Sequence, residues 1–151
     1  MGLLTGLSQC MLYSWQEGDE AMAKGKRSTT PTPRQRLGAR GEALAAQALA
    51  AAGYHIIQPN VRMPNGQVDI LAEENGELIF VEVKTRSSTA FGVPAEAITP
   101  AKQRHLIAAA QEYLALHEIP DHPWRIDVVG ILMVDGKPEI EIIRYAVGEQ
   151  E

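Results

Sequence analysis

Residues 67–86 read "QVDILAEENGELIFVEVKTR" and contain two apolar runs joined by a short polar turn. Asn75-Gly76, between the two runs, is the strongest short signal for a hairpin with a two-residue type I′ turn. Each run also carries charged residues, and a charge inside a buried strand costs free energy unless another group compensates it. Asp69, Glu82 and Lys84 therefore need a structural or functional reason to be there.

A hairpin that turns at Asn75-Gly76 determines which side chains face each other. Asp69 then faces Glu82, and Gln67 faces Lys84, so these four form one polar patch on one face. The opposite face carries the apolar side chains that are expected to pack inward: Val68, Ile70, Val81 and Val83. Like charges directly opposite each other destabilise a strand pair. The two carboxylates therefore need a proton, a cation or both.

A divalent metal ion is the simplest partner for two facing carboxylates. Mg²⁺ prefers carboxylate oxygens and keeps several waters when few protein ligands are present. Lys84 is placed to contact an attacking water or the charge that develops on a phosphate. The pattern predicts metal-assisted phosphodiester hydrolysis with Mg²⁺, for which Mn²⁺ is expected to substitute. The alternative is a structural salt bridge between Lys84 and Glu82 on an edge hairpin.

The chain has 151 residues, enough for one domain with a real core, which we assign to residues 36–148. Residues 1–35 are predicted to be a disordered basic extension, because "KGKRSTTPTPRQR" is polar, contains proline and lacks periodicity. Residues 1–16 lack the basic start of a signal peptide, and the acidic Glu17, Asp19 and Glu20 follow them, so we predict that there is no signal peptide. Met22 is an alternative start to Met1. The single cysteine, Cys10, fits a reducing compartment, and we expect a cytoplasmic protein.

Charge is distributed unevenly along the chain. The net charge is −5, yet residues 21–41 contain six basic residues and none of the 19 acids: Lys24, Lys26, Arg27, Arg34, Arg36 and Arg40. A basic arm beside an acidic body suggests an anionic partner for the arm. A solvated leader is the alternative. No apolar run reaches transmembrane length, so no membrane partner is expected, and a homodimer is left open.

The order of elements predicts an α/β domain with a mixed central sheet and helices packed on it. A helix is expected over residues 37–52, followed by strands near 55–58, 67–72 and 78–85. A loop then leads to a second helix, for which Thr99 is the N-cap and Pro100 the first residue. Two further strands follow, over residues 124–134 and 139–146.

Several motifs occur together in the order typical of one bacterial family. They are Gly38, Gly41, Glu42 and Ala45 on the first helix, then "NVR" (60–62), "GQVDIL" (66–71) and "FVEVKTR" (80–86). Over about residues 37–147 the chain resembles the YraN-like family, a branch of the PD-(D/E)xK nuclease superfamily related in fold to Holliday-junction resolvases. The resemblance implies an αβββαβ restriction-endonuclease-like core and Mg²⁺-dependent cleavage of nucleic acid.

The resemblance also implies roles for individual residues. Asp69 and Glu82 would be metal ligands, Lys84 the catalytic lysine, and Glu42 the helix-borne acid that completes the metal site. This chain has Gln67 where many family members carry glutamate. For Glu42 the alternative is a surface acid near a helix start, where the macrodipole favours it.

Basic residues near these motifs are candidates for nucleic-acid contacts. Arg86 follows the hairpin patch, Arg40 belongs to the basic segment, and Lys102 and Arg104 lie in the first turn of the second helix. Cations there oppose the helix macrodipole, which a phosphate backbone would explain. A solvated helix face is the alternative. Asp127 interrupts an apolar strand, and we favour a structural role for it, paired with an arginine such as Arg144.

Three functions remain open at this point. The first is a metal-dependent nuclease acting on structured or branched DNA, which we favour over RNA. The second is a nucleic-acid-binding module with a nuclease fold and no turnover. The third is an assembly protein whose acidic body binds a basic partner. The complete set of Asp69, Glu82 and Lys84 favours the first over the second.

Overall fold

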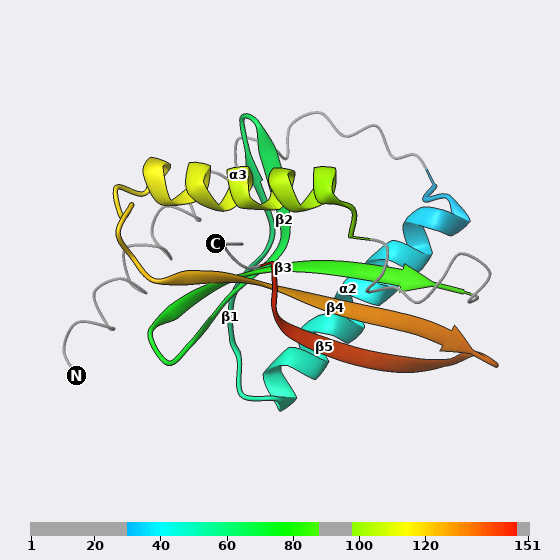
Figure 1. Ribbon diagram of the computed structural model, residues 1–151. Coiled ribbons are helices and arrows are strands. Elements are labelled where there is room, and N and C mark those ends of the chain that lie inside the picture. The colour runs from blue at the N-terminus through cyan, green and yellow to red at the C-terminus, as the bar shows by residue number, and fades with distance from the viewer. Residues whose placement is uncertain (1–29, 88–97, 148–151) are drawn as a thin grey trace.

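The computed structural model describes residues 30–87 and 98–147, and the predicted basic extension falls almost entirely outside them (Figure 1). The elements are α2 (Pro33–Ala51), β1 (His55–Met63), β2 (Gly66–Glu74), β3 (Glu77–Arg86), α3 (Pro100–Leu116), β4 (Trp124–Val134) and β5 (Lys137–Val147). The predicted loop before the second helix also lies mostly outside the described residues. In the described part of the chain, neither helix is long and apolar enough to cross a membrane.

The five strands form one sheet in the order β1-β2-β3-β4-β5. Neighbouring strands are antiparallel except β3 and β4, which run parallel. A parallel pair needs a crossover connection, and α3 provides it. This arrangement confirms the predicted α/β fold, an αβββαβ core with a mixed sheet, to which β5 adds an edge strand.

The helices cover opposite faces of the sheet, and each has its own apolar core (Figure 1). Under α3, Phe80 packs with Leu106 and Tyr113, and the Phe80 and Tyr113 rings meet edge to face with centroids 5.6 Å apart. Under α2, Leu49 packs with Ile79 and other aliphatic side chains of the sheet. Both faces of β3 are therefore buried, which explains its nearly continuous apolar sequence.

Helix α2 begins at Pro33, four residues before the predicted start. Thr32 is its N-cap: the Thr32 hydroxyl accepts a hydrogen bond from the Gln35 amide, and the Gln35 side chain accepts one from the Thr32 amide. This reciprocal pair satisfies two amides that a helix start leaves free. Helix α3 begins as predicted, with Thr99 as N-cap and Pro100 in the first position.

The β2–β3 hairpin turns at the predicted residues. Asn75 and Gly76 have φ values of 52° and 79°, as a type I′ turn requires. Glu74 pairs with Glu77 and Ile70 with Val81, which confirms the predicted register over this part of the hairpin. The ladder ends at Ile70, so the predicted pairing of Gln67 with Lys84 is wrong; Gln67 pairs with Arg62 of β1 instead.

On the N-terminal side of Ile70, strand β2 separates from β3, and the tip of the β1–β2 hairpin packs against α3 (Figure 1). At its tip the Asn65 amide donates to Glu112 Oε1 at 3.1 Å, and a Cβ on Gly66 would lie 3.1 Å from the Ala109 methyl group. Val68 consequently packs in the core under α3, whereas Ile70 packs under α2. The prediction that Val68 shares a face with Ile70 is therefore wrong, because the strand bends between them.

Candidate functional site

The candidate site lies where β2 and β3 separate. The Val83 amide donates a hydrogen bond to Asp69 Oδ2 at 2.9 Å. The Asp69 side chain thus binds a backbone group of β3 just beyond the last paired residues of the two strands. This contact fixes one carboxylate oxygen of Asp69 and places the acid beside the Glu82-Val83-Lys84 segment. The predicted cross-strand pairing of Asp69 with Glu82 does not form, because the β2–β3 ladder ends at Ile70 and Val81.

Glu82 is buried, with 5% of its surface exposed, on the sheet face covered by α3. Its Oε1 lies 3.6 Å from Lys84 Nζ and 3.2 Å from Lys102 Nζ. Burial raises the pKa of Glu82, and the negative charge of Asp69 raises it further, while the two lysines act in the opposite direction. Among the residues that the structure describes, the carboxylate is therefore compensated only by lysine ammonium groups, and it keeps an acid as its neighbour.

Glu42 extends this acidic group from α2. Burial raises the pKa of Glu42, the charge of Asp69 adds to the effect, and a side-chain hydrogen bond with Asn60 opposes it. The electrostatic coupling to Asp69 supports the prediction that Glu42 reaches the hairpin acids. Asn60 is a contact that sequence reasoning missed, although it is the first residue of the "NVR" motif and has a left-handed φ of 49°.

A close approach of α2 to β3 brings Glu42 to this position. A Cβ on Gly41 would lie 2.0 Å from Thr85 Oγ1, a distance at which the two elements could not pack. The helix therefore touches the strand only because residue 41 is glycine. Glu42 follows directly on the helix, and Thr85 follows directly after Lys84 on the strand, so this contact holds both halves of the site together.

The donor atoms of the site suit a hard cation. Asp69, Glu82 and Glu42 offer carboxylate oxygens, and such oxygens are the ligands that Mg²⁺ prefers. Within residues 30–87 and 98–147, however, no three Asp, Glu, His or Cys side chains converge closely enough to form a complete metal cage. An ion bound here would keep several waters, as Mg²⁺ commonly does, and Asp69 and Glu82 would supply its first protein ligands.

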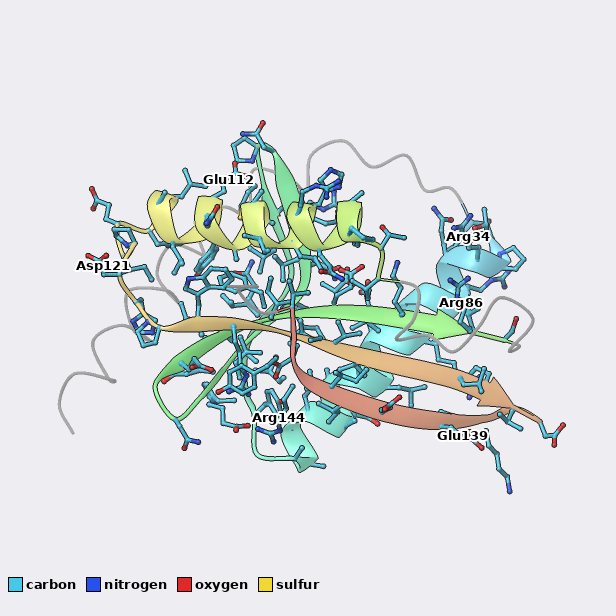
Figure 2. All side chains as sticks on the ribbon, in the orientation of Figure 1. Arg34, Arg86, Glu112, Asp121, Glu139 and Arg144 are labelled. Atoms are coloured by element: carbon cyan, nitrogen blue, oxygen red, sulfur yellow. The ribbon has the colours of Figure 1, made fainter. Side chains whose placement is uncertain are left out.

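The predicted nucleic-acid contacts fall in different places. Arg40 and Arg104 are exposed on α2 and α3, and Arg86 is half-buried at the end of β3. Arg86 lies at the same end of the molecule as Arg34, in the first turn of α2 (Figure 2). Lys102 belongs to the site itself, because its ammonium group pairs with Glu82.

A second polar cluster surrounds Asp127, which is fully buried on β4. Asp127 accepts hydrogen bonds from the Tyr54 hydroxyl at 2.7 Å, from Arg125 Nε at 3.0 Å and from the Tyr145 amide at 3.0 Å. Burial raises the pKa of Tyr54 to about 12, so its hydroxyl remains a donor.

The contacts of Asp127 support a structural role, but its predicted partner is wrong. Arg125 forms the ion pair, whereas Arg144 pairs with Glu74 of the β2–β3 hairpin and lies over the Tyr54 ring (Figure 2). Arg125 is two residues before Asp127, and residues two apart share a face of a strand. This spacing is the signal that could have identified the pair from the sequence.

Comparison with known proteins gives a consistent result. Residues 41–131 match the Uncharacterised protein family UPF0102. A UPF0102 protein of Dehalococcoides mccartyi is 41% identical over 78% of this chain and 97% of its own length. UPF0102 proteins of Roseiflexus castenholzii and Symbiobacterium thermophilum are 45% and 47% identical, over 77% and 74% of this chain and 96% of their own lengths. The matched region contains all the residues of the candidate site.

Proposed function

The chain belongs to the UPF0102 family, the YraN-like family that its motifs indicated, and we propose that it is a Mg²⁺-dependent nuclease. The proposed reaction is hydrolysis of phosphodiester bonds in nucleic acid, with structured or branched DNA as the favoured substrate. The observation that supports it is the cluster of Asp69, Glu82 and Lys84 where β2 and β3 separate. Neighbouring acids beside a lysine, one of them buried with a raised pKa, are typical of sites that bind a metal and act on phosphate.

The roles of the residues follow from their positions. Asp69 and Glu82 would hold the metal, and Glu42, which is coupled to Asp69, would complete the ligand set or orient a metal-bound water. The bound Mg²⁺ would lower the pKa of the attacking water and neutralise charge on the phosphate. The Val83 amide orients Asp69, so the acid does not need to reorganise when the substrate arrives.

Lys84 is the cation of the cluster that lies on the same strand as Glu82, and its positive charge would attract a phosphate. Its ammonium group is partly exposed, whereas Glu82 is buried. Lys84 can therefore donate to a phosphate oxygen or to the attacking water while Glu82 remains inside. Arg86, Arg40 and Arg104 would contact the phosphate backbone on either side of the scissile bond.

A cleavage assay on a panel of nucleic acids tests the proposal. Duplex, flap, four-way-junction and single-stranded DNA, with matching RNA, would be incubated with the full chain in Mg²⁺ or in EDTA. We expect Mg²⁺-dependent cleavage of a branched DNA and its loss in Asp69→Asn. The matched control is Asp135→Asn, because Asp135-Gly136-Lys137 repeats the acid-x-Lys spacing in an exposed turn. Equal cleavage by both variants would contradict the proposal.

A binding module without turnover is the second candidate. It is favoured by the incomplete metal cage within the described residues and by the two lysines that already pair with Glu82. In that case the full chain would bind branched DNA in EDTA without needing Mg²⁺, and would cleave none of the panel in either condition. Light scattering during the same experiments would test whether the protein acts as a homodimer.

A further inference from the structure

In the part of the chain that the structure describes, Lys102 is the closest cation to the buried Glu82 carboxylate. Its Nζ lies 3.2 Å from Glu82 Oε1, against 3.6 Å for Lys84 Nζ. The two lysines belong to different elements. Lys84 is on the same strand as Glu82, whereas Lys102 projects from the first turn of α3. Both ammonium groups therefore converge on one oxygen atom.

The position of Lys102 in its helix is unfavourable without an acid nearby. The first turn of a helix carries the positive end of the macrodipole, which disfavours a cation. The Lys102 amide is fixed by a 3.2 Å hydrogen bond to the Thr99 hydroxyl, so the side chain leaves the helix at a defined point. The ion pair with Glu82 offsets the unfavourable position and gives this lysine a reason to be there.

We propose that Lys102 is an internal counter-cation, which holds Glu82 in the metal-free protein and is displaced when a divalent metal binds. This inference rests on the proposed function, because it concerns the same carboxylate. The Lys102 side chain is 37% exposed and the Glu82 side chain 6%. The ammonium group thus lies on the solvent side of a buried acid and can move into water, while the acid stays.

The charge balance of the site supports the displacement. Without metal, Asp69 and Glu82 are matched by Lys84 and Lys102. A divalent ion added to both lysines would leave an excess of positive charge in a partly buried site, even with Glu42 included, and such an excess is costly. Departure of Lys102 reduces the excess and frees Glu82 Oε1 for the metal. Lys84 contacts the same oxygen at the longer distance of 3.6 Å, and in the proposed function its charge is used by the phosphate.

Calorimetric titration with Mn²⁺ alone, on the full chain without nucleic acid, tests the proposal. We expect Lys102→Met to bind Mn²⁺ roughly tenfold to a hundredfold more tightly than wild type, because a competing charge is removed. Lys102→Arg keeps the charge and should remain within about threefold of wild type. Arg104→Met removes an exposed charge from the same helix turn and serves as the matched control, with a change of less than about threefold.

The outcomes separate this inference from the proposed function. Equal or weaker Mn²⁺ binding by Lys102→Met would overturn the counter-cation role and leave the nuclease proposal in place. An absence of Mn²⁺ binding in wild type and in every variant would overturn both. Lys102→Gln, which can still donate to Glu82, is a second neutral variant should Lys102→Met fold poorly without metal. The affinity gain should also vanish when Lys102→Met/Glu82→Gln is compared with Glu82→Gln alone, and a gain of the same size in that background would contradict competition for Glu82.

Discussion

Glu82 and Asp127 are both acids buried in the central sheet, on the neighbouring strands β3 and β4. Asp127 accepts from a tyrosine hydroxyl, a guanidinium group and a backbone amide, all held by the fold. Within residues 30–87 and 98–147, Glu82 is paired only with the ammonium groups of two partly exposed lysines, and burial, followed by the charge of Asp69, raises its pKa. A buried acid whose donors are held inside the fold stabilises it, whereas a buried acid whose partners are partly exposed is available to a ligand.

The largest effect on stability should come from Asp127→Ala, which removes the central acid of the buried Asp127 cluster. The change removes the acceptor of the Tyr54 hydroxyl, Arg125 Nε and the Tyr145 amide. The buried guanidinium then keeps only Glu74 and Glu77 among the described residues, and we expect a loss of about 3–5 kcal/mol in the free energy of unfolding. Urea denaturation measures it, with exposed Asp121→Ala as the control (Figure 2). Arg125→Met/Asp127→Ala should lose less than the two single losses combined. A loss below about 1 kcal/mol, within the range of surface pairs, would break the comparison.

Lys84→Ala changes the partly exposed Glu82 cluster and should lower turnover instead of stability. Cleavage of the best substrate should fall by a factor on the order of 10² to 10³, the usual cost of losing one electrostatic stabiliser. Mn²⁺ affinity should be unchanged or higher, because a nearby positive charge is lost. Lys137→Ala, in the second acid-x-Lys sequence, is the control. Normal turnover in Lys84→Ala would leave Lys84 as a salt-bridge partner only.

Asp69→Asn should abolish cleavage and yet stabilise the metal-free protein by up to about 1 kcal/mol. The reason is that the charge of Asp69 opposes ionisation of both Glu42 and Glu82. An asparagine can still accept the hydrogen bond from the Val83 amide. Thermal melts in EDTA at neutral pH measure the change, and a clearly lower melting temperature than wild type would contradict the repulsion between the acids.

The smallest effect is a pH dependence of stability without metal. The pKa of Glu82 is raised in the folded protein from its ordinary 4.5. The folded state therefore binds more protons between the ordinary value and the raised one, and stability falls as the pH rises through this window. Glu82→Gln should flatten the slope, while exposed Glu139→Gln should keep it (Figure 2). Equal slopes in the two variants would show that Glu82 does not titrate in this range.

The hairpin and its acids could be predicted because they depend on local sequence. Asn75-Gly76 fixes the turn, and the turn fixes the register from Glu74 to Ile70. The bend beyond Ile70 could not be predicted, since it follows from the docking of Asn65 and Gly66 on α3. Contacts between elements that are distant in the sequence cannot be predicted from the residues next to them in the chain.

The same limit applies to the ion pairs. Lys102 was expected to face a phosphate, but its partner is Glu82, and that pairing depends on where α3 crosses the sheet. Asp127 was expected to pair with an arginine, and it does, although with Arg125 rather than Arg144. The residue types indicated that the buried charges would be paired. Only the three-dimensional arrangement identifies which charges meet.

The strand order has a consequence for how the chain folds. Consecutive strands pair throughout, and three of the four pairs are antiparallel and close through short turns. Only the parallel β3–β4 pair must wait for a long segment, including α3, to cross over, and closing a long loop costs more entropy. We therefore expect formation of this seam to set the folding rate, with φ-values near one for truncations in it such as Val129→Ala. The candidate site lies beside the seam, so it would be assembled in the same slow step.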